Sequence, residues 1–304
     1  MSRFSLIVAT FDRTNELRVL LKSFAKQELG DFEVIVVDQN SDDRVVQLLK
    51  EFTAEAKTQE TGHHLFNQVK YIRSAPGASR ARNQGLAHAS GEILAFPDDD
   101  CWYPADTLKK VDEWFRQRQE YGILSIGCRD EAGRISSNRW WQAECDIKWI
   151  NIFRTSGGCC FFVRRPTGAV PVLFDESLGP GAGTRFGCGE DTDYLLTLMS
   201  HGIRGRFYSA WHVGHPCRDG FVDVQRAERY GGGFGRVLRK HSNPYLFAGL
   251  VTFDFARAAL RMLLGDREQA ARFWAHGRGM ISAYLSQGEL MGNYRERLIS
   301  HRHR

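Results

Sequence analysis

The sequence predicts an α/β fold in which a mainly parallel sheet is covered by helices on both faces and followed by a helical C-terminal extension. Through the first 130 residues, short apolar segments alternate with helical patterns, as is typical of right-handed crossovers between parallel strands. In the last hundred residues the periodicity is mostly helical. With 304 residues, 42% of them apolar and 25% charged, the chain is long enough to bury a core, which excludes the disordered and fibrous classes.

The expected strands are short runs rich in Val, Ile, Leu and Phe, at 5–11, 32–38, 69–73, 92–97, 122–128 and 159–164. Helices are expected at 14–28, 43–55, 78–89, 105–120 and 191–200, and from 245 onward. In the first helix, Leu17, Leu21 and Phe24 recur at helical spacing, and Thr14 occupies the N-cap position. A boundary near 241–244 divides the predicted α/β body, 1–243, from a C-terminal helical region, 244–304.

Charge is unevenly distributed along the chain. Residues 1–200 have 24 basic and 28 acidic side chains, a net charge of −4, whereas residues 201–304 have 17 and 8, a net charge of +9. A basic third of this size suggests an anionic partner. In the helix from Tyr245, a charged face with Asp254, Arg257 and Arg261 lies opposite an apolar face. The apolar face either packs on the protein or docks onto an anionic membrane surface.

The seven cysteines are odd in number and form no C-x-x-C pair, so we expect reduced thiols rather than a disulfide framework or a zinc ribbon. The N-terminal apolar run is too short for a signal peptide, and no run of 18 uncharged apolar residues occurs. We therefore expect a cytoplasmic protein, in peripheral contact with the inner face of the membrane if the basic helix docks there.

Carboxylates follow three of the predicted strands, at Asp12, Asp38 and the triplet Asp98–Asp100. Ligands of open α/β sheets bind at the carboxyl ends of the strands. Three adjacent carboxylates repel one another unless a cation compensates, and oxygen ligands favour Mg²⁺ or Mn²⁺, which bridge nucleotide phosphates. The first turn has no G-x-G-x-x-G motif and the chain has no Gly-Lys pair, which excludes the dinucleotide-binding fingerprint and the P-loop.

Five segments in this order resemble family 2 glycosyltransferases of the GT-A fold: SLIVATFDR (5–13), VVDQNS (36–41), GASRARNQGL (77–86), GEILAFPDDD (91–100) and GEDTD (189–193). The resemblance covers roughly residues 4–215. It implies a GT-A, Rossmann-like fold with a nucleotide-binding half, 1–130, and an acceptor-binding half, 131–243. It also implies transfer of a sugar from a nucleotide diphosphate with inversion at the anomeric carbon.

The resemblance assigns roles by position. Residues at the donor-binding positions are Thr10, Phe11, Asp12, Asp38, Arg82, Asn83 and Asp98. Asp99, Asp100 and His215 are expected to bind Mn²⁺ or Mg²⁺, with Asp99 the best single choice; which two of the three aspartates reach the metal stays open, as does the choice between His212 and His215. Pro97 stands where the family motif usually begins with Asp, and Gln39 stands where a second Asp is common.

Inverting transfer needs a general base for the acceptor hydroxyl and stabilisation of the departing diphosphate. The resemblance places the base at Asp191, with Glu190 as the second possibility; the alternative is that both only begin a helix, where its dipole favours them. The expected partners are a nucleotide-sugar donor and a glycan or polyprenyl-diphosphate-linked acceptor of surface polysaccharide assembly. Nucleic acid is not expected, because the arginines form no recognisable motif.

Two other functions stay open from the sequence alone. A metal-dependent nucleotidyltransferase would use the same sheet and carboxylates but would need no base after residue 185. A non-catalytic module that binds sugar nucleotides would share the fold, since fold alone does not establish activity. We therefore expect a transferase that moves one hexosyl or deoxyhexosyl group.

Overall fold

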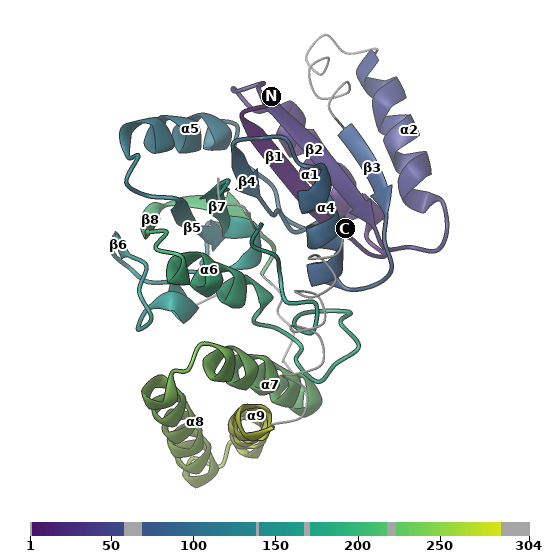
Figure 1. Cartoon of the computed structure of the whole chain (residues 1–304). Coiled ribbons are helices and arrows are strands. Elements are labelled where there is room, and N and C mark those ends of the chain that lie inside the picture. Colours follow the sequence, from purple (N-terminus) through teal and green to yellow (C-terminus); the bar gives the residue numbers. More distant parts are fainter. Residues whose placement is uncertain (1, 58–68, 138–139, 167–170, 218–222, 287–304) are drawn as a thin grey trace, which may run out of the picture. The chain divides into compact units, whose positions relative to one another are not determined.

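The computed structural model describes residues 2–57, 69–137, 140–166, 171–217 and 223–286 (Figure 1). The chain forms two compact units. Unit 1 consists of Met1–Thr184 and Glu190–Gly220, and unit 2 consists of Arg185–Gly189 and Phe221–Arg304. This division falls earlier than the predicted boundary near 241–244, because the helix that precedes that boundary packs with the two helices that follow it.

Unit 1 is built on one sheet with the strand order β3-β2-β1-β4-β7-β5-β8-β6. The described strands are β1 (Phe4–Thr10), β2 (Phe32–Asp38), β3 (Val69–Arg73), β4 (Ile93–Ala95), β5 (Ile123–Arg129), β6 (Cys145–Asp146), β7 (Phe161–Arg164) and β8 (Gly205–Gly214). The pairs β1–β2, β1–β4, β2–β3 and β5–β8 are parallel, whereas β7 is antiparallel to both β4 and β5, and β6 to β8. The predicted α/β class is confirmed.

Helices connect the strands of unit 1 (Figure 1). They are α1 (Thr14–Ala25), α2 (Arg44–Lys57), α4 (Ala78–His88), α5 (Thr107–Gln117) and α6 (Glu190–Ser200), with short 3-10 turns η1 (Ile152–Arg154) and η2 (Gly158–Cys160). Every residue of β2 is buried, as expected for a strand covered on both faces of a parallel sheet. Where an element was predicted, its bounds agree with the observed ones to within a few residues, but the strands β6 and β8 are not among the predicted ones.

Three strand ends meet at one edge of the sheet. The parallel register pairs Thr10 with Asp38, and a bridge pairs Ala9 with Asp98, so the carboxyl ends of β1, β2 and β4 lie together. Strand β7 runs antiparallel to β4, with Ala95 opposite Phe162, and therefore brings the preceding turn η2 to the same edge. This edge is where open α/β sheets bind their ligands.

Unit 2 consists of three described helices, α7 (Val224–Lys240), α8 (Pro244–Leu263) and α9 (Arg267–Leu285). Gly231 and Gly235 of α7 lie against backbone atoms of α9, so no side chain fits between the two helices there. The Asn243 side chain accepts a hydrogen bond from the Leu246 amide at the start of α8, with Pro244 in the first helical turn. The predicted helical character of 244–304 is confirmed to residue 285; residues 287–304 lie outside the described residues.

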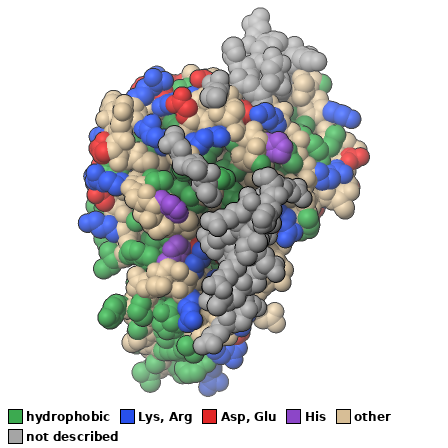
Figure 2. Space-filling model, in the orientation of Figure 1, with side chains coloured by type: hydrophobic (Ala, Val, Ile, Leu, Met, Phe, Trp, Pro, Cys, Tyr) green, Lys and Arg blue, Asp and Glu red, His purple; other side chains and the backbone are tan. Residues whose placement is uncertain are grey.

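In α8 the charged face is directed into unit 2 and the apolar face is exposed, which is the reverse of a helix that packs on a hydrophobic core. The charged side chain of Asp254 is buried and hydrogen-bonds His276 of α9, and Arg257 stacks on the Phe273 ring, 3.8 Å from its centroid. The large apolar side chains on the other face are exposed: Tyr245 (89%), Phe253 (57%), Leu260 (55%) and Leu263 (85%). Hydrophobic side chains accordingly gather at the surface over α8 (Figure 2). These four side chains are therefore not buried within unit 2, and docking of this face on a membrane stays a prediction.

Candidate active site

Two carboxylates and an imidazole converge at the carboxyl end of β4. One ligand atom each from Asp98, Asp100 and His215 lies within 4.8 Å of the others, and His215 Nε2 is 3.4 Å from Asp100 Oδ1. His215 reaches this place because Trp102 and Gly214 exchange two backbone hydrogen bonds, of 2.9 and 2.8 Å. Two carboxylate oxygens and an imidazole nitrogen are suitable ligands for Mn²⁺ and, less typically, Mg²⁺. The residues present therefore fit a divalent metal ion.

The protonation of His215 responds to these carboxylates. Burial lowers the pKa of His215, but the hydrogen bond to Asp100 and the charge of Asp98 outweigh burial and raise it to about 9. Nδ1 lies 2.9 Å from the backbone carbonyl of Pro216, which fixes that nitrogen as a donor and leaves Nε2 directed at Asp100. His212 does not belong to this group, so the geometry selects His215 over His212.

Asp99 does not belong to the group that its two neighbours form with His215. Its Oδ2 accepts a hydrogen bond from Thr10 Oγ1 at 2.9 Å, and its Oδ1 accepts one from Arg13 Nη1 at 2.9 Å. Arg13 also donates to Asp100 Oδ2 at 2.8 Å. We predicted Asp99 as a metal ligand and Asp98 as a donor-binding residue; in the structure it is Asp98, not Asp99, that lies with Asp100 and His215. The reason is that successive side chains leave the backbone in different directions, which adjacent letters in a sequence do not record.

Arg82 joins this group to the start of α6. Its Nη2 donates to Asp98 Oδ1 at 3.0 Å, and its Nη1 donates to Asp191 Oδ1 at 2.9 Å and lies 3.5 Å from Glu190 Oε1. The Arg82 side chain is only 5% exposed. Its guanidinium also lies over the Phe174 ring, 5.4 Å from the centroid. One buried cation thus balances three carboxylates from two distant segments of the chain.

Glu190 and Asp191 have different surroundings although they are adjacent. Burial raises the pKa of both carboxyl groups, and their mutual repulsion adds to this for Glu190. Glu190 Oε2 is buried without a hydrogen-bond partner, and the backbone of Gly179, with φ of +95°, lies directly over this carboxyl group. The Asp191 side chain is 18% exposed, twice the 9% of Glu190. Of the two, Asp191 has more contact with the space outside the protein.

A missing side chain lets these groups approach one another. A Cβ atom on Gly158, the first residue of η2, would lie 2.9 Å from Asp191 Oδ2, 3.1 Å from Arg82 Nη2 and 3.3 Å from Asp98 Oδ1. These distances are shorter than ordinary carbon contacts. Glycine at this position therefore allows the three charged groups to meet.

Two of the residues expected to bind the donor are engaged within the protein. Asn83 bonds both backbone groups of Phe174, accepting from its amide at 2.8 Å and donating to its carbonyl at 3.0 Å. Asp38 is fully buried and accepts hydrogen bonds from Asn40 Nδ2 at 2.7 Å and Tyr71 Oη at 2.9 Å. Both side chains thus have partners within the protein, and their contact with the donor stays a prediction.

The turn after β1 is open to solvent. Phe11 is 55% exposed, and Asp12 adopts a left-handed conformation with φ of +58°, its amide bonded to Asn40 Oδ1 at 2.9 Å. The Asp12 carboxylate pairs with Arg44. Phe11 and Asp12 thus lie where an incoming ligand could meet them, at the same edge as Asp98.

Sequence reasoning missed Arg13 and Tyr71, which hold Asp99, Asp100 and Asp38. Arg13 lies directly after the end of a predicted strand, next to Asp12, and this position is the sequence signal that points to it. Tyr71 lies within β3, and its contact with Asp38 follows from the pairing of β3 with β2, which aligns Asp38 with Arg73.

The pattern that defines glycosyl transferase family 2 matches residues 5–166, just over half of the chain. Among curated proteins, the poly(ribitol-phosphate) beta-N-acetylglucosaminyltransferase TarS of Staphylococcus aureus is 32% identical over 136 residues, which are 44% of this chain and 22% of TarS. The GalNAc(5)-diNAcBac-PP-undecaprenol beta-1,3-glucosyltransferase of Campylobacter jejuni is 34% identical over 103 residues, which are 33% of this chain and 30% of that protein. The matches thus span less than a third of either relative.

Solved structures agree on the fold over nearly the whole chain. The S. aureus TarS fragment 1–349 in complex with UDP-GlcNAc aligns with a TM-score of 0.54 at 18% identity, covering 92% of this chain and 91% of the fragment. The mannosyltransferase PcManGT from Pyrobaculum calidifontis, in complex with GDP-Man and Mn²⁺, aligns with a TM-score of 0.60 at 18% identity, covering 95% and 88%. The chain therefore belongs to glycosyl transferase family 2 and has the GT-A fold.

Proposed function

We propose that this protein transfers one sugar residue from a nucleotide-diphosphate sugar to an acceptor hydroxyl, with inversion at the anomeric carbon and with a divalent metal ion. The observation that carries the proposal is the position of Arg82, which joins the Asp98, Asp100 and His215 group to Asp191. A site for a diphosphate and a site for a base thereby lie on either side of one buried guanidinium. Membership of the glycosyltransferase family supports the same reaction class.

The metal ligands of this proposal are Asp98, Asp100 and His215. A Mn²⁺ or Mg²⁺ ion bound to them would stabilise the negative charge that develops on the departing nucleoside diphosphate. Arg13 holds Asp100 through a hydrogen bond of 2.8 Å and so orients this ligand. Mn²⁺ in the structure of PcManGT supports a divalent ion of this kind.

Asp191 is the proposed general base. Its carboxylate would accept the proton of the acceptor hydroxyl as that oxygen attacks the anomeric carbon from the face opposite the diphosphate. Arg82 holds Oδ1 at 2.9 Å, which leaves Oδ2, beside Gly158, as the oxygen for the proton. Glu190 is less suited, because Gly179 covers its carboxyl group.

The experiment measures release of nucleoside diphosphate from a panel that includes UDP-GlcNAc and GDP-Man, with Mn²⁺ and with a mixture of glycan and lipid-diphosphate acceptors. We expect one donor to be consumed, and we expect Asp191→Asn to reduce turnover by at least ~10²-fold while donor binding is retained. Full activity of Asp191→Asn with pyrophosphate release from a nucleoside triphosphate would identify a nucleotidyltransferase instead. Donor binding without turnover of any acceptor would identify a binding module.

We further propose that unit 2 docks on an anionic membrane surface through the exposed apolar face of α8, defined by Tyr245, Phe253, Leu260 and Leu263. All four side chains that define this face are uncharged. Residues 223–286 contain ten basic and five acidic side chains, and Trp274 of α9 is also exposed, as is typical of helices at a membrane interface. In the described part of the chain, no helix of 18 or more residues is apolar enough to cross a bilayer.

A membrane surface would bring the enzyme to an acceptor carried on a polyprenyl diphosphate. The undecaprenol-linked acceptor in the name of the C. jejuni relative supports this class of acceptor, as does the basic character of unit 2. Such an acceptor would present its sugar hydroxyl at the headgroup level, where a peripheral enzyme can reach it without entering the bilayer.

The docking test uses vesicle sedimentation of the full chain with phosphatidylglycerol-containing vesicles and with phosphatidylcholine alone. The double variant Leu260→Glu/Leu263→Glu should bind the anionic vesicles at least ~10-fold more weakly, because it replaces with charges two exposed leucines that would enter the apolar layer of the membrane. Ile150→Glu, which changes a side chain of unit 1 about as exposed as Leu263, should bind as the wild type does. Equal binding of wild type and double variant would contradict docking, and a dimer that only the double variant loses would assign the face to a second copy.

A further inference from the structure

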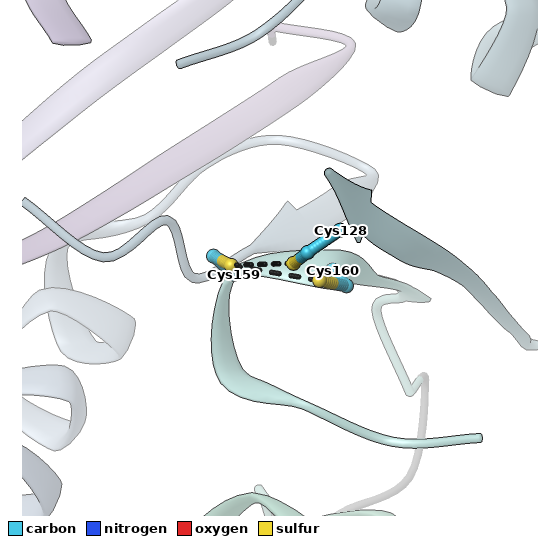
Figure 3. Close-up of side chains that lie close together, drawn as sticks. All are labelled: Cys128, Cys159 and Cys160. Atoms are coloured by element: carbon cyan, nitrogen blue, oxygen red, sulfur yellow. Dashed lines mark hydrogen bonds between the residues drawn. The ribbon is translucent and has the colours of Figure 1, made fainter. Parts of the chain in front are cut away.

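Three cysteines from two distant segments bring their sulfur atoms together inside unit 1. Cys128 lies near the end of β5, and Cys159 and Cys160 lie in η2; their Sγ atoms are all within 4.8 Å of one another (Figure 3). Cys159 Sγ is 3.4 Å from Cys128 Sγ and 3.5 Å from Cys160 Sγ. Each of the three residues is at most 2% exposed. We call these three residues the thiol cluster.

The sheet determines this arrangement. Strands β5 and β7 are antiparallel, with Ser125 opposite Phe161, so the chain beyond the last pair carries Cys128 toward the turn that precedes β7. A fourth cysteine, Cys101, is fully buried, and burial together with the neighbouring Cys159 thiol raises its pKa. Three sulfurs from two segments therefore face one another in a region closed to solvent.

The separations match the size of a tetrahedral thiolate site. Zinc–sulfur bonds of about 2.3 Å place neighbouring sulfurs in a tetrahedron about 3.8 Å apart. The two measured separations of 3.4 and 3.5 Å lie within a few tenths of an ångström of this value. A small shift of each side chain would therefore admit an ion, with no change in the strand pairing.

We propose that the thiol cluster binds one thiophilic d¹⁰ metal ion, zinc in particular, through the thiolates of Cys128, Cys159 and Cys160. Cys101 lies outside the group of three and would become the fourth ligand by turning its side chain toward the ion. The site is distinct from the Asp98, Asp100 and His215 group, which offers oxygen and nitrogen but no sulfur. With four protein ligands and no open position, it would be a structural site. Zinc entering it would displace the thiol protons, which pass to solvent as the site closes.

An ion in the thiol cluster would connect two loops of the candidate active site. Cys101 follows Asp100 directly in the chain. Cys159 follows Gly158, at which an added Cβ atom would touch Asp191 and Arg82. An ion shared by Cys101 and Cys159 would tie together the two loops that carry these groups. The proposal does not depend on the transferase reaction, because its readouts are metal content and absorption.

The first measurement is the zinc content of the full chain, purified under reducing conditions from zinc-supplemented cells. We expect about one zinc ion per chain in the wild type and at least ~10-fold less in Cys128→Ser and Cys160→Ser. Cys145→Ser is the matched control, because its sulfur lies outside the thiol cluster and bonds Asn151, and it should keep the wild-type content. Wild type without zinc, or Cys128→Ser with undiminished zinc, would overturn the proposal.

The second measurement remains decisive if the serine variants do not fold. Wild-type protein produced in minimal medium with cobalt in place of zinc should show the intense thiolate-to-cobalt charge-transfer absorption and the visible bands of tetrahedral Co²⁺. Asp100→Asn should keep these bands, because its carboxylate belongs to the other group. Bound cobalt without charge-transfer absorption would place the ion on oxygen and nitrogen ligands and would overturn the thiolate site.

Discussion

Arg82 Nη1 lies 2.9 Å from Asp191 Oδ1, a hydrogen bond between residues 109 positions apart in the chain. The same guanidinium bonds Asp98, so it balances buried carboxylates from both sides of the candidate site. Removing one partner of such a buried arrangement leaves uncompensated charge in a low-dielectric environment. Substitution of Arg82 should therefore have a large effect on stability as well as on activity.

Arg82→Gln should lower the free energy of unfolding by about 3–5 kcal/mol, because three carboxylates lose their shared cation. Urea denaturation at neutral pH measures the change. Arg80→Gln is the control two residues away, since Arg80 is 43% exposed and pairs with Glu176 at 3.3 Å; its effect should stay below about 1 kcal/mol. Equal effects of the two variants would contradict the central role of Arg82.

Gly158→Ala should reduce kcat/KM by at least ~10-fold and destabilise the protein by about 1–3 kcal/mol, because the added methyl group pushes apart Asp191, Arg82 and Asp98. Steady-state kinetics and urea denaturation measure the two effects. Gly127→Ala is the control, because a Cβ there meets its nearest neighbour, the Trp211 carbonyl, at an ordinary 3.6 Å. An unchanged kcat/KM in Gly158→Ala would show that these groups need not approach so closely.

Among the aspartates of the triplet, Asp100 and Asp99 should respond differently to substitution. Asp100→Asn should weaken Mn²⁺ binding by at least ~10-fold, because it removes a ligand oxygen, whereas Asp99→Asn should weaken it less, because Asp99 bonds Thr10 and Arg13. Electron paramagnetic resonance of free Mn²⁺ gives the affinities. Chelation with EDTA should abolish turnover, and added Mn²⁺ should restore it. A larger loss of Mn²⁺ affinity in Asp99→Asn than in Asp100→Asn would instead support Asp99 as the main metal ligand.

Glu33 should make stability depend on pH. Burial by itself raises the pKa of this carboxyl, but hydrogen bonds from Lys70, Ser5 and Ser90 lower it from 4.5 to about 2. Because the folded-state pKa lies below the unfolded one, the stabilisation is complete above about pH 4.5 and is lost as the pH falls toward 2. The difference in unfolding free energy between wild type and Glu33→Gln should therefore shrink between pH 6 and pH 3. A difference that grows with acidification would contradict this account.

Much of the nucleotide-binding half was predictable, because its signals are local. Alternating apolar and helical periodicities located β1, β2, β3 and β4, and the known placement of ligands at strand ends directed attention to Asp98–Asp100. His215 was predicted from a resemblance rather than from its own surroundings. Its contact with Asp100 depends on the backbone pairing of Trp102 with Gly214, which leaves no trace in the spacing of residues.

Local patterns predicted the fold class, the strand ends that bear carboxylates and the amphipathic character of α8, because hydrophobic period and turn chemistry act over a few residues. Only the tertiary structure decided that Asp98 rather than Asp99 faces Asp100 and His215, and that the apolar face of α8 points outward. It alone brought Cys128, Cys159 and Cys160 into one cluster. These outcomes depend on side-chain direction and on pairing between segments far apart in the chain, and packing of the whole molecule fixes both.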